Sequence, residues 1–484
     1  MMAEIYGIDL GTRNTAVEGR GGRLSGEAGS TIPSAVAYDS LSDQIRHGSD
    51  AMRLLHGTEA ERERWCVATS FKTALDSDAP FVRAGARTKS AAEVLTDYFS
   101  ALVRQAEAAG LPPLRDAVLS IPVGFSPLSR SRLTKAAEDA GIRVHGLVSE
   151  STAAFLQIAH VDAPAVRIAV VDWGAGTLDV SILNVTRTGL GGAVIDETAS
   201  LGSRLAGDEI DLAIYESMAS KARRDGRAIP SRDAVDPAVL RTILSACERT
   251  KIALCGEAGH PDISSVIVGA FSDGKVGSFE LSRTELMELS RPARTAAFQV
   301  LEESIERAGL VPGQLDRVIF VGGCTRIAGF KEEAQARFGP AAFFPQNPEW
   351  TVSGGALKVA RREAQYESIQ EFGCILDDGW FQSLTTSGQL LAFDGTPHSI
   401  TVATTESTDT ASLVFAERQA GRTATVATLS VPVVGHLGEP VEIVTTLRRD
   451  LTVEIAARSR CGDRTRDERR ATYANTRFRF RVSS

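Results

Sequence analysis

Apolar residues follow two different patterns along the chain. Up to about Gln365, short β-branched runs alternate with longer segments whose apolar positions recur every three or four residues, which predicts an α/β fold. The helix that follows a strand at 117–121 has clear ends: Ser126 suits the N-cap, Pro127 the first helical position, and Gly141 follows the last. Further helices are predicted at 240–254, 283–309 and 356–368.

The second pattern begins after Phe372, where helical periodicity ends and apolar and polar residues alternate over short runs. Turns rich in Gly, Pro, Asp and Ser separate these runs, which is typical of a small antiparallel β-sandwich with one buried face. The runs lie at 399–402, 411–415, 441–444, 451–455 and 477–482. We therefore predict an α/β domain over 1–365, a linker over 366–373 and a β-sandwich over 374–484, with no helical segment after it.

Composition narrows the class of protein. At 484 residues the chain is too long for one core, and its 43% hydrophobic and 24% charged content is that of an ordinary soluble protein. A net charge of −8 argues against a nucleic-acid partner, and neither a signal peptide nor a membrane-spanning run is apparent. The 6 cysteines are scattered without metal-ligand spacing, which favours reduced thiols and a cytoplasmic location.

One hairpin pattern occurs twice, at 5–18 and 168–185. Each copy is an apolar strand that ends in Asp, turns through Gly and Thr, and returns as a second strand. Gly lets backbone N–H groups approach an anion, Thr offers a hydroxyl, and a strand-end carboxylate can hold hydrated Mg²⁺. One copy alone is a weak signal, but two facing copies would hold the β- and γ-phosphates of a nucleotide from both sides. The residues are Asp9, Gly11, Thr12 and Arg13 in the first copy, and Asp172, Gly174, Ala175, Gly176 and Thr177 in the second.

A third glycine element lies at 318–327, where a buried strand runs into Gly322 and Gly323 and then into a helix. Paired glycines would let an adenosine ring lie against bare backbone, and Arg326 could stack on its plane. Strand–Gly–helix junctions are common in α/β proteins, so this element gains weight only from following the two hairpins.

Four further segments, 121–130, 149–154, 205–211 and 247–255, give the chain a resemblance to a known family. Together with the hairpins they resemble the DnaK-like 70-kDa heat-shock chaperones, within the actin and sugar-kinase ATPase superfamily. The resemblance covers roughly the first three-quarters of the chain. It implies a duplicated actin-like (ribonuclease H-like) ATPase fold in two lobes, followed by a C-terminal antiparallel β-sandwich that binds peptides.

The resemblance also implies roles in magnesium-dependent ATP hydrolysis. Asp9 and Asp172 would hold Mg²⁺ through its waters, while the catalytic residues would be Lys72, Glu150, Thr177 and Asp179. From the residues alone, Lys72 would be a solvated lysine on a helix. ATP or ADP would further contact Gly207, Glu248, Lys251, Cys255, Gly322, Gly323, Arg326 and Glu349. Glu248 and Lys251, three apart on one helical face, could equally form a surface ion pair.

Pro122 and Arg130 resemble a relay that senses the nucleotide, although a strand-end proline and an exposed helix arginine are the alternative. Several positions depart from the family pattern. Arg13 stands where the family has a second threonine, Ala175 replaces a glycine, and Cys255 replaces a serine beside adenine. The linker lacks the family's leucine cluster, and the helical lid is absent.

We therefore expect an ATP-hydrolysing, lidless chaperone that binds extended polypeptide segments under nucleotide control. A J-domain co-chaperone and a nucleotide exchange factor are the partners that the resemblance implies. One alternative is a nucleotide-gated regulatory or scaffold module with one dedicated protein partner. Another is a small-molecule kinase of the same superfold, although the sequence offers no polar substrate pocket and the β-domain would then be unexplained.

Overall fold

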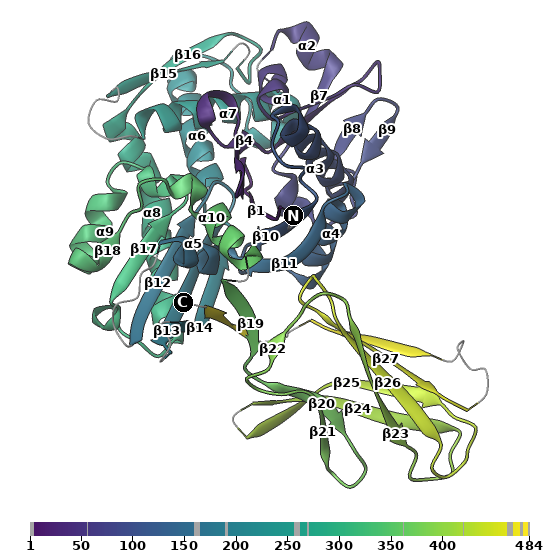
Figure 1. Cartoon of the computed structure of the whole chain (residues 1–484). Helices are drawn as coiled ribbons and strands as arrows, with labels where there is room; N and C mark the ends of the chain where they lie inside the picture. Colours follow the sequence, from purple (N-terminus) through teal and green to yellow (C-terminus); the bar gives the residue numbers. More distant parts are fainter. Residues whose placement is uncertain are drawn as a thin grey trace.

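The computed structural model describes residues 4–55, 57–158, 165–188, 192–255, 262–268, 271–361, 363–419, 421–461, 468–474 and 478–482. Figure 1 shows two α/β lobes side by side and a β-domain projecting from their base. This arrangement confirms the predicted fold class of a two-lobed α/β domain followed by an antiparallel β-sandwich.

Lobe I is built on the sheet that contains the first hairpin. Its strands are β1 (Tyr6–Leu10), β2 (Asn14–Gly19), β3 (Gly22–Leu24), β4 (Ile32–Pro33), β10 (Asp116–Ile121) and β11 (Arg143–Ser149). Its helices are α3 (Ala91–Ala108), α4 (Pro127–Asp139) and α5 (Glu150–Ile158), with the 3₁₀ turn η2 (Phe71–Ala74). A peripheral layer holds β5 (Ala35–Asp39), β6 (Ile45–His47), α1 (Gly48–Leu55), α2 (Glu59–Arg64), β7 (Trp65–Thr69), β8 (Val82–Ala84) and β9 (Arg87–Lys89). As predicted, the Ser126 hydroxyl caps α4 by accepting the Ser129 N–H at 3.0 Å.

Lobe II repeats the same plan around the second hairpin. Its strands are β12 (Ala165–Trp173), β13 (Leu178–Arg187), β14 (Ala193–Ser203), β17 (Arg317–Val321) and β18 (Ala342–Phe343), with the separate hairpin β15 (Ile263–Val268) and β16 (Gly277–Ser282). Its helices are α6 (Gly207–Arg224), α7 (Pro237–Leu254), α8 (Arg283–Arg307) and α9 (Phe330–Phe338), while α10 (Pro348–Ala360) crosses back to lobe I. In each lobe the first strand pairs antiparallel with its hairpin partner and parallel with a later strand, which is the expected sign of a duplication.

The β-domain consists of two 4-stranded antiparallel sheets. One has the order β21 (Phe381–Thr385), β20 (Glu371–Ile375), β24 (Thr410–Gln419), β25 (Arg422–Pro432). The other has the order β23 (Pro397–Ala403), β26 (Pro440–Leu447), β27 (Val453–Ser459), β28 (Arg469–Tyr473). The predicted alternating runs up to 455 therefore belong to the sandwich.

The connection between the parts differs from the prediction in two ways. Helix α10 ends at Ala360, and the residues predicted to complete a helix and begin a linker form β19 (Ala364–Ser368). The last predicted run forms β29 (Phe478–Val482), which leaves the sandwich and joins the lobe II sheet, whereas Arg477 lies outside the described residues. That sheet has 8 strands in the order β18-β17-β12-β13-β14-β29-β19-β22, with β22 spanning Leu390–Leu391. Local propensity is a weak guide here because a distant partner strand decides the conformation.

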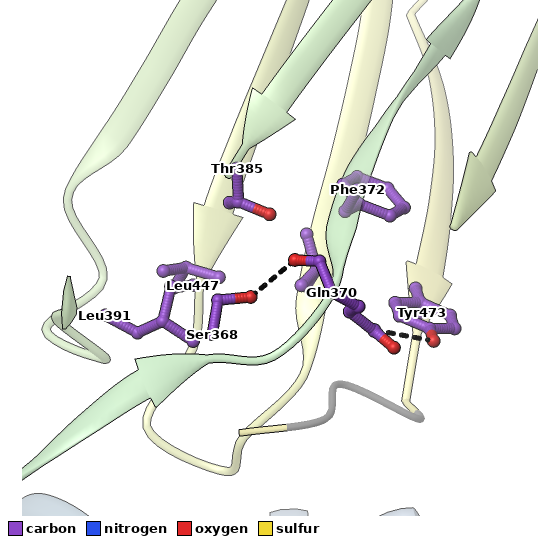
Figure 2. A pocket seen from close by; sticks show the side chains of 8 residues that line it. Ser368, Gln370, Phe372, Thr385, Leu391, Leu447 and Tyr473 are labelled. Carbon is purple, nitrogen blue, oxygen red and sulfur yellow. Dashed lines mark hydrogen bonds between the residues drawn. The ribbon is translucent and has the colours of Figure 1, made fainter. Parts of the chain in front are cut away.

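A small pocket, partly open to solvent, lies where β19 enters the sandwich (Figure 2). The Ser368 hydroxyl donates to the Gln370 carbonyl at 2.6 Å, and the Gln370 amide donates to the Tyr473 hydroxyl at 3.2 Å. The remaining lining is mainly apolar: Phe372, Thr385, Leu391, Leu447 and Val453. None of the predicted nucleotide-site residues lines it. Within the described residues, no helix is long and apolar enough to cross a membrane.

Candidate active site

The two hairpins face each other and touch at their tips. Each turn is closed in the same way, by the Gly11 N–H donating to the Asn14 carbonyl and the Gly174 N–H donating to the Thr177 carbonyl, both at 2.9 Å. A Cβ at Gly176 would lie 2.7 Å from both Cγ2 and Oγ1 of Thr12, so only glycine allows this approach. The turns that carry the predicted phosphate-binding residues therefore meet across the lobes.

A buried ion pair lies beside the hairpins. Lys72 Nζ donates to Glu150 Oε1 at 2.5 Å, and the two residues are 4% and 5% exposed. Lys72 stands on η2 and Glu150 begins α5, so different elements of lobe I supply the pair. Burial alone lowers the pKa of Lys72, but the Glu150 and Asp9 carboxylates outweigh burial and raise it. Lys72 is thus a buried cation and not a solvated surface lysine.

Three aspartates complete a strongly acidic cluster around this pair. Burial, followed by the charge of Glu150, raises the pKa of Asp9 to about 6 and that of Asp179 to about 7. Asp172, which is opposite Asp179 in the β12–β13 register, has a pKa well above its usual range because of burial and the neighbouring Glu150 and Asp9. Four carboxylates therefore surround one ammonium group in a buried place.

The cluster fits a hydrated magnesium ion. Buried carboxylates need a compensating cation, and Asp179 Oδ2 has no hydrogen-bond partner among the described residues. Hydrogen bonds orient one oxygen each of Asp9 and Asp179. Asp9 Oδ1 accepts from the Ser120 hydroxyl at 2.6 Å, and Asp179 Oδ1 accepts from the Val123 N–H at 3.0 Å. Across the described ranges, no three His, Cys, Asp or Glu side chains converge closely enough to bind a metal directly. The carboxylates of Asp9 and Asp172 could hold Mg²⁺ through its water ligands.

Lys251 forms a second buried ion pair on the lobe II side. Lys251 Nζ lies 2.8 Å from Asp211 Oδ1 and donates to the Gly207 carbonyl at 2.9 Å. Burial raises the pKa of Asp211 to about 7, although Lys251 opposes the shift. Gly207 is packed tightly, since a Cβ there would lie 2.8 Å from Cys324 Sγ. Lys251 is therefore not paired with Glu248 on the surface.

Arg13 reaches from the first hairpin to lobe II. Its Nη2 lies 2.7 Å from Asp208 Oδ1, and its Nε lies 3.3 Å from Glu248 Oε1. Burial alone would lower the pKa of Arg13, but Glu248 and Asp208 outweigh burial and raise it. The guanidinium thus balances two acids in the region predicted for the ribose and phosphates.

The third glycine element packs against the second hairpin. Gly322 has a φ of +86°, and a Cβ there would lie 2.4 Å from the Trp173 carbonyl oxygen and 2.6 Å from Asp172 Oδ1. At Gly323, by contrast, an added Cβ would have no atom within 4 Å, so the space next to this residue is open. Arg326 and Glu349 form a half-exposed ion pair at 3.0 Å.

Cys255 lies at the end of α7, close to Lys251. Burial raises the pKa of its thiol to about 11, so the side chain is neutral near pH 7. A neutral thiol is a weaker hydrogen-bond donor than the serine that the family resemblance places there.

Sequence reasoning missed Ser120, Asp208 and Asp211 as members of the site. Asp208 and Asp211 stand in the segment that carried the family resemblance, but nothing local pairs them with Arg13 and Lys251. Ser120 is one residue of a buried strand, and its hydroxyl becomes informative only because β10 lies parallel to β1.

The fold and the site together define a two-lobed protein of the actin-like nucleotide-binding class. Residues 5–361 match the family model described as "Hsp70 protein", and the chain belongs to this family. It is also similar to the "Chaperone protein DnaK" of Akkermansia muciniphila, with 28% identity over 382 residues. That match covers 73% of this chain and 58% of the relative, so the chain spans less than two thirds of the DnaK length.

Proposed function

We propose that this chain is a magnesium-dependent, ATP-hydrolysing chaperone whose β-domain binds extended polypeptide segments under nucleotide control. The observation that carries the proposal is the buried cluster of Lys72, Glu150 and the three aspartates between two touching hairpins. Phosphoryl transfer to water depends on positioning and on charge stabilisation more than on covalent chemistry. A buried, protonated lysine beside buried carboxylates supplies both.

Each residue of the site would have its own role in ATP hydrolysis. Lys72 would hold the γ-phosphate and polarise the attacking water, while the free oxygen of Asp179 would orient that water. Thr177 would contact the γ-phosphate from the second hairpin. Magnesium, when bound, would neutralise phosphate charge through waters held by Asp9 and Asp172. Lobe II would contact the nucleoside through Glu248, Lys251 and the Gly322 element.

Exposed apolar side chains on loops of the β-domain support binding of a polypeptide. Three loops meet there: Thr404 Oγ1 donates to the His436 carbonyl at 2.8 Å, and the Thr405 hydroxyl donates to Asp377. The turn between β20 and β21 points away from the lobes in Figure 1. Trp380 in this turn is 66% exposed, and Leu437, in the loop between β25 and β26, is 72% exposed. Strands β21 and β23 lie at the edges of their sheets, a position at which an extended segment can add as a further strand.

A J-domain co-chaperone, a nucleotide exchange factor and a cytoplasmic location complete the proposal. Membership of the Hsp70 family supports these partners, and six unpaired thiols suit a reducing compartment.

Steady-state phosphate release tests the catalytic half of the proposal. Lys72→Ala should reduce turnover by at least about 100-fold, because it removes the buried charge at the reacting phosphate. Lys89→Ala is the matched control: Lys89 on β9 forms an ion pair with Asp97 on α3 at the same 2.5 Å, but both side chains are partly exposed. Equal turnover in the wild type and in Lys72→Ala would contradict the assigned role.

Apolar peptides test the chaperone half. We expect ATP and ADP to change the affinity for a fluorescent apolar peptide, and Trp380→Ala to weaken that affinity. If hydrolysis depends on Lys72 but peptide binding ignores the nucleotide, the chaperone half of the proposal is wrong.

A further inference from the structure

The returning strand β29 lies between two strands of lobe II. It pairs antiparallel with β14, from Ala193↔Val482 to Ile195↔Phe480, and with β19, from Ala364↔Val482 to Ser368↔Phe478. Figure 1 shows this strand, in the colour of the last residues, beside β14 and β19. The chain therefore enters and leaves the β-domain through neighbouring strands of one sheet.

Charge fixes β29 to β19. The Glu367 side chain is fully buried, and its carboxylate accepts hydrogen bonds from Arg479 Nε at 2.8 Å and Arg481 Nε at 2.5 Å. Aromatic packing adds to this contact, because the Tyr366 ring centroid lies 5.1 Å from those of both Phe478 and Phe480. Strand β29 thus helps to hold Tyr366, together with Phe393, whose ring centroid also lies 5.1 Å from that of Tyr366.

Tyr366 reaches out of this sheet to the other lobe. Its hydroxyl donates to the Leu147 carbonyl on β11 at 2.6 Å. Gly146 provides the space, since a Cβ there would lie 2.5 Å from the Tyr366 hydroxyl. Strand β11 ends at Ser149, and the next residue is Glu150, the partner of Lys72. One hydrogen bond therefore joins the connection between the domains to the strand that delivers the proposed catalytic carboxylate.

We infer that Tyr366 is a positioning residue for Glu150 and that β29 holds it in place, so that ATP turnover depends on the strand returning from the β-domain. The inference rests on the proposed function of Lys72 and Glu150. Small displacements of positioned groups reduce chemistry more than binding. Loss of the Tyr366 hydroxyl should therefore lower kcat while KM for ATP stays nearly constant.

Tyr366→Phe tests the inference because it removes one oxygen and keeps the ring. We expect kcat to fall by about two- to ten-fold, the range for loss of one buried hydrogen bond. Tyr6→Phe is the matched control: Tyr6 is also buried, and its hydroxyl also donates to a carbonyl, that of Pro112, at 2.6 Å. An unchanged kcat in Tyr366→Phe, or an equal fall in both variants, overturns the inference.

Hydrogen exchange separates this inference from the proposed function. In Tyr366→Phe, and in the double variant Arg479→Gln/Arg481→Gln, the amides at 147–152 should exchange faster than in the wild type, whether or not ATP is hydrolysed. Unchanged exchange there in both variants overturns the inference even if Lys72→Ala abolishes turnover. If these amides exchange faster but turnover does not depend on Lys72, the proposed catalytic role of Lys72 is refuted. The structural contact between Tyr366 and β11 is then still supported.

Discussion

Arg13 shows how one residue sets the charge balance between the first hairpin and lobe II. It lies between Asp208 and Glu248, and the charge of Asp211 also acts on it. Arg13→Thr would leave these acids uncompensated beside an anionic triphosphate. We expect the affinity for Mg-ATP, measured by calorimetry, to fall about ten-fold, which corresponds to about 1.4 kcal/mol for a charged hydrogen bond.

Arg13→Lys is the control for this prediction because it keeps the positive charge but lacks the planar guanidinium that contacts Asp208 and Glu248 at the same time. It should restore part of the affinity. Tighter binding of Mg-ATP to Arg13→Thr would mean instead that the wild-type guanidinium obstructs the phosphates.

Residues of the site differ in how far the sequence reveals them. The signal that predicts Asp9 and Asp172 is local: a strand, an acid and a glycine turn lie within a few positions. The pairing of Arg13 with Asp208 spans 195 positions, and no local pattern contains it. The burial of Lys72 likewise depends on Glu150, which comes from another helix 78 positions away, so only the family resemblance pointed to it.

At the level of elements, strand β19 depends on a buried carboxylate. Burial alone would raise the pKa of Glu367, but Arg479 and Arg481 outweigh burial and lower the pKa below the usual 4.5. The stabilisation is present above pH 4.5 and is lost as the pH falls through the lowered pKa of the folded state. Acid should therefore loosen β29 from β19.

Glu367→Gln tests this pH dependence by chemical unfolding. Near pH 7 the variant should be less stable by about 1–3 kcal/mol, because a hydrogen-bonded buried charge is lost while both arginines keep contact with water. The difference from the wild type should shrink as the pH falls below about 4. Glu303→Gln, which breaks an exposed pair with Arg307, should cost less than about 1 kcal/mol at any pH. A difference that does not vary with pH would contradict the role of the Glu367 charge.

The same two strands mark where prediction of elements fails. Alternating arginine and phenylalanine correctly predicted a strand near 478–482, since periodicity is a property of the segment itself. Its assignment to the sandwich was wrong, because periodicity does not identify the partner strand. For 364–368 even the type of element was wrong, since pairing with β29 outweighs the helical preference of the segment.

At the scale of the whole molecule, the β-domain is attached to the lobes at several points. Besides β19 and β29, Arg130 Nη2 donates to the Ala474 carbonyl at 2.9 Å, and Arg449 lies 3.0 Å from Glu138 on α4. One continuous buried apolar cluster extends from lobe I into the sandwich. The β14–β29–β19 ladder therefore joins both ends of the β-domain to lobe II.

Small-angle scattering tests this attachment. In the full chain, ATP and ADP should give nearly the same radius of gyration, because the β14–β29–β19 ladder joins the β-domain to lobe II. Truncation after residue 474 removes β29, which joins β19 to β14, and leaves β19 paired only with β22. The radius of gyration should then rise and become sensitive to salt through the surface pair of Arg449 and Glu138. If ATP expands the full chain as much as truncation does, β29 is a displaceable strand and the domains separate during the cycle. If neither changes the radius, the contacts of Arg130 and Arg449 suffice to hold the β-domain, and the sheet is not the principal attachment.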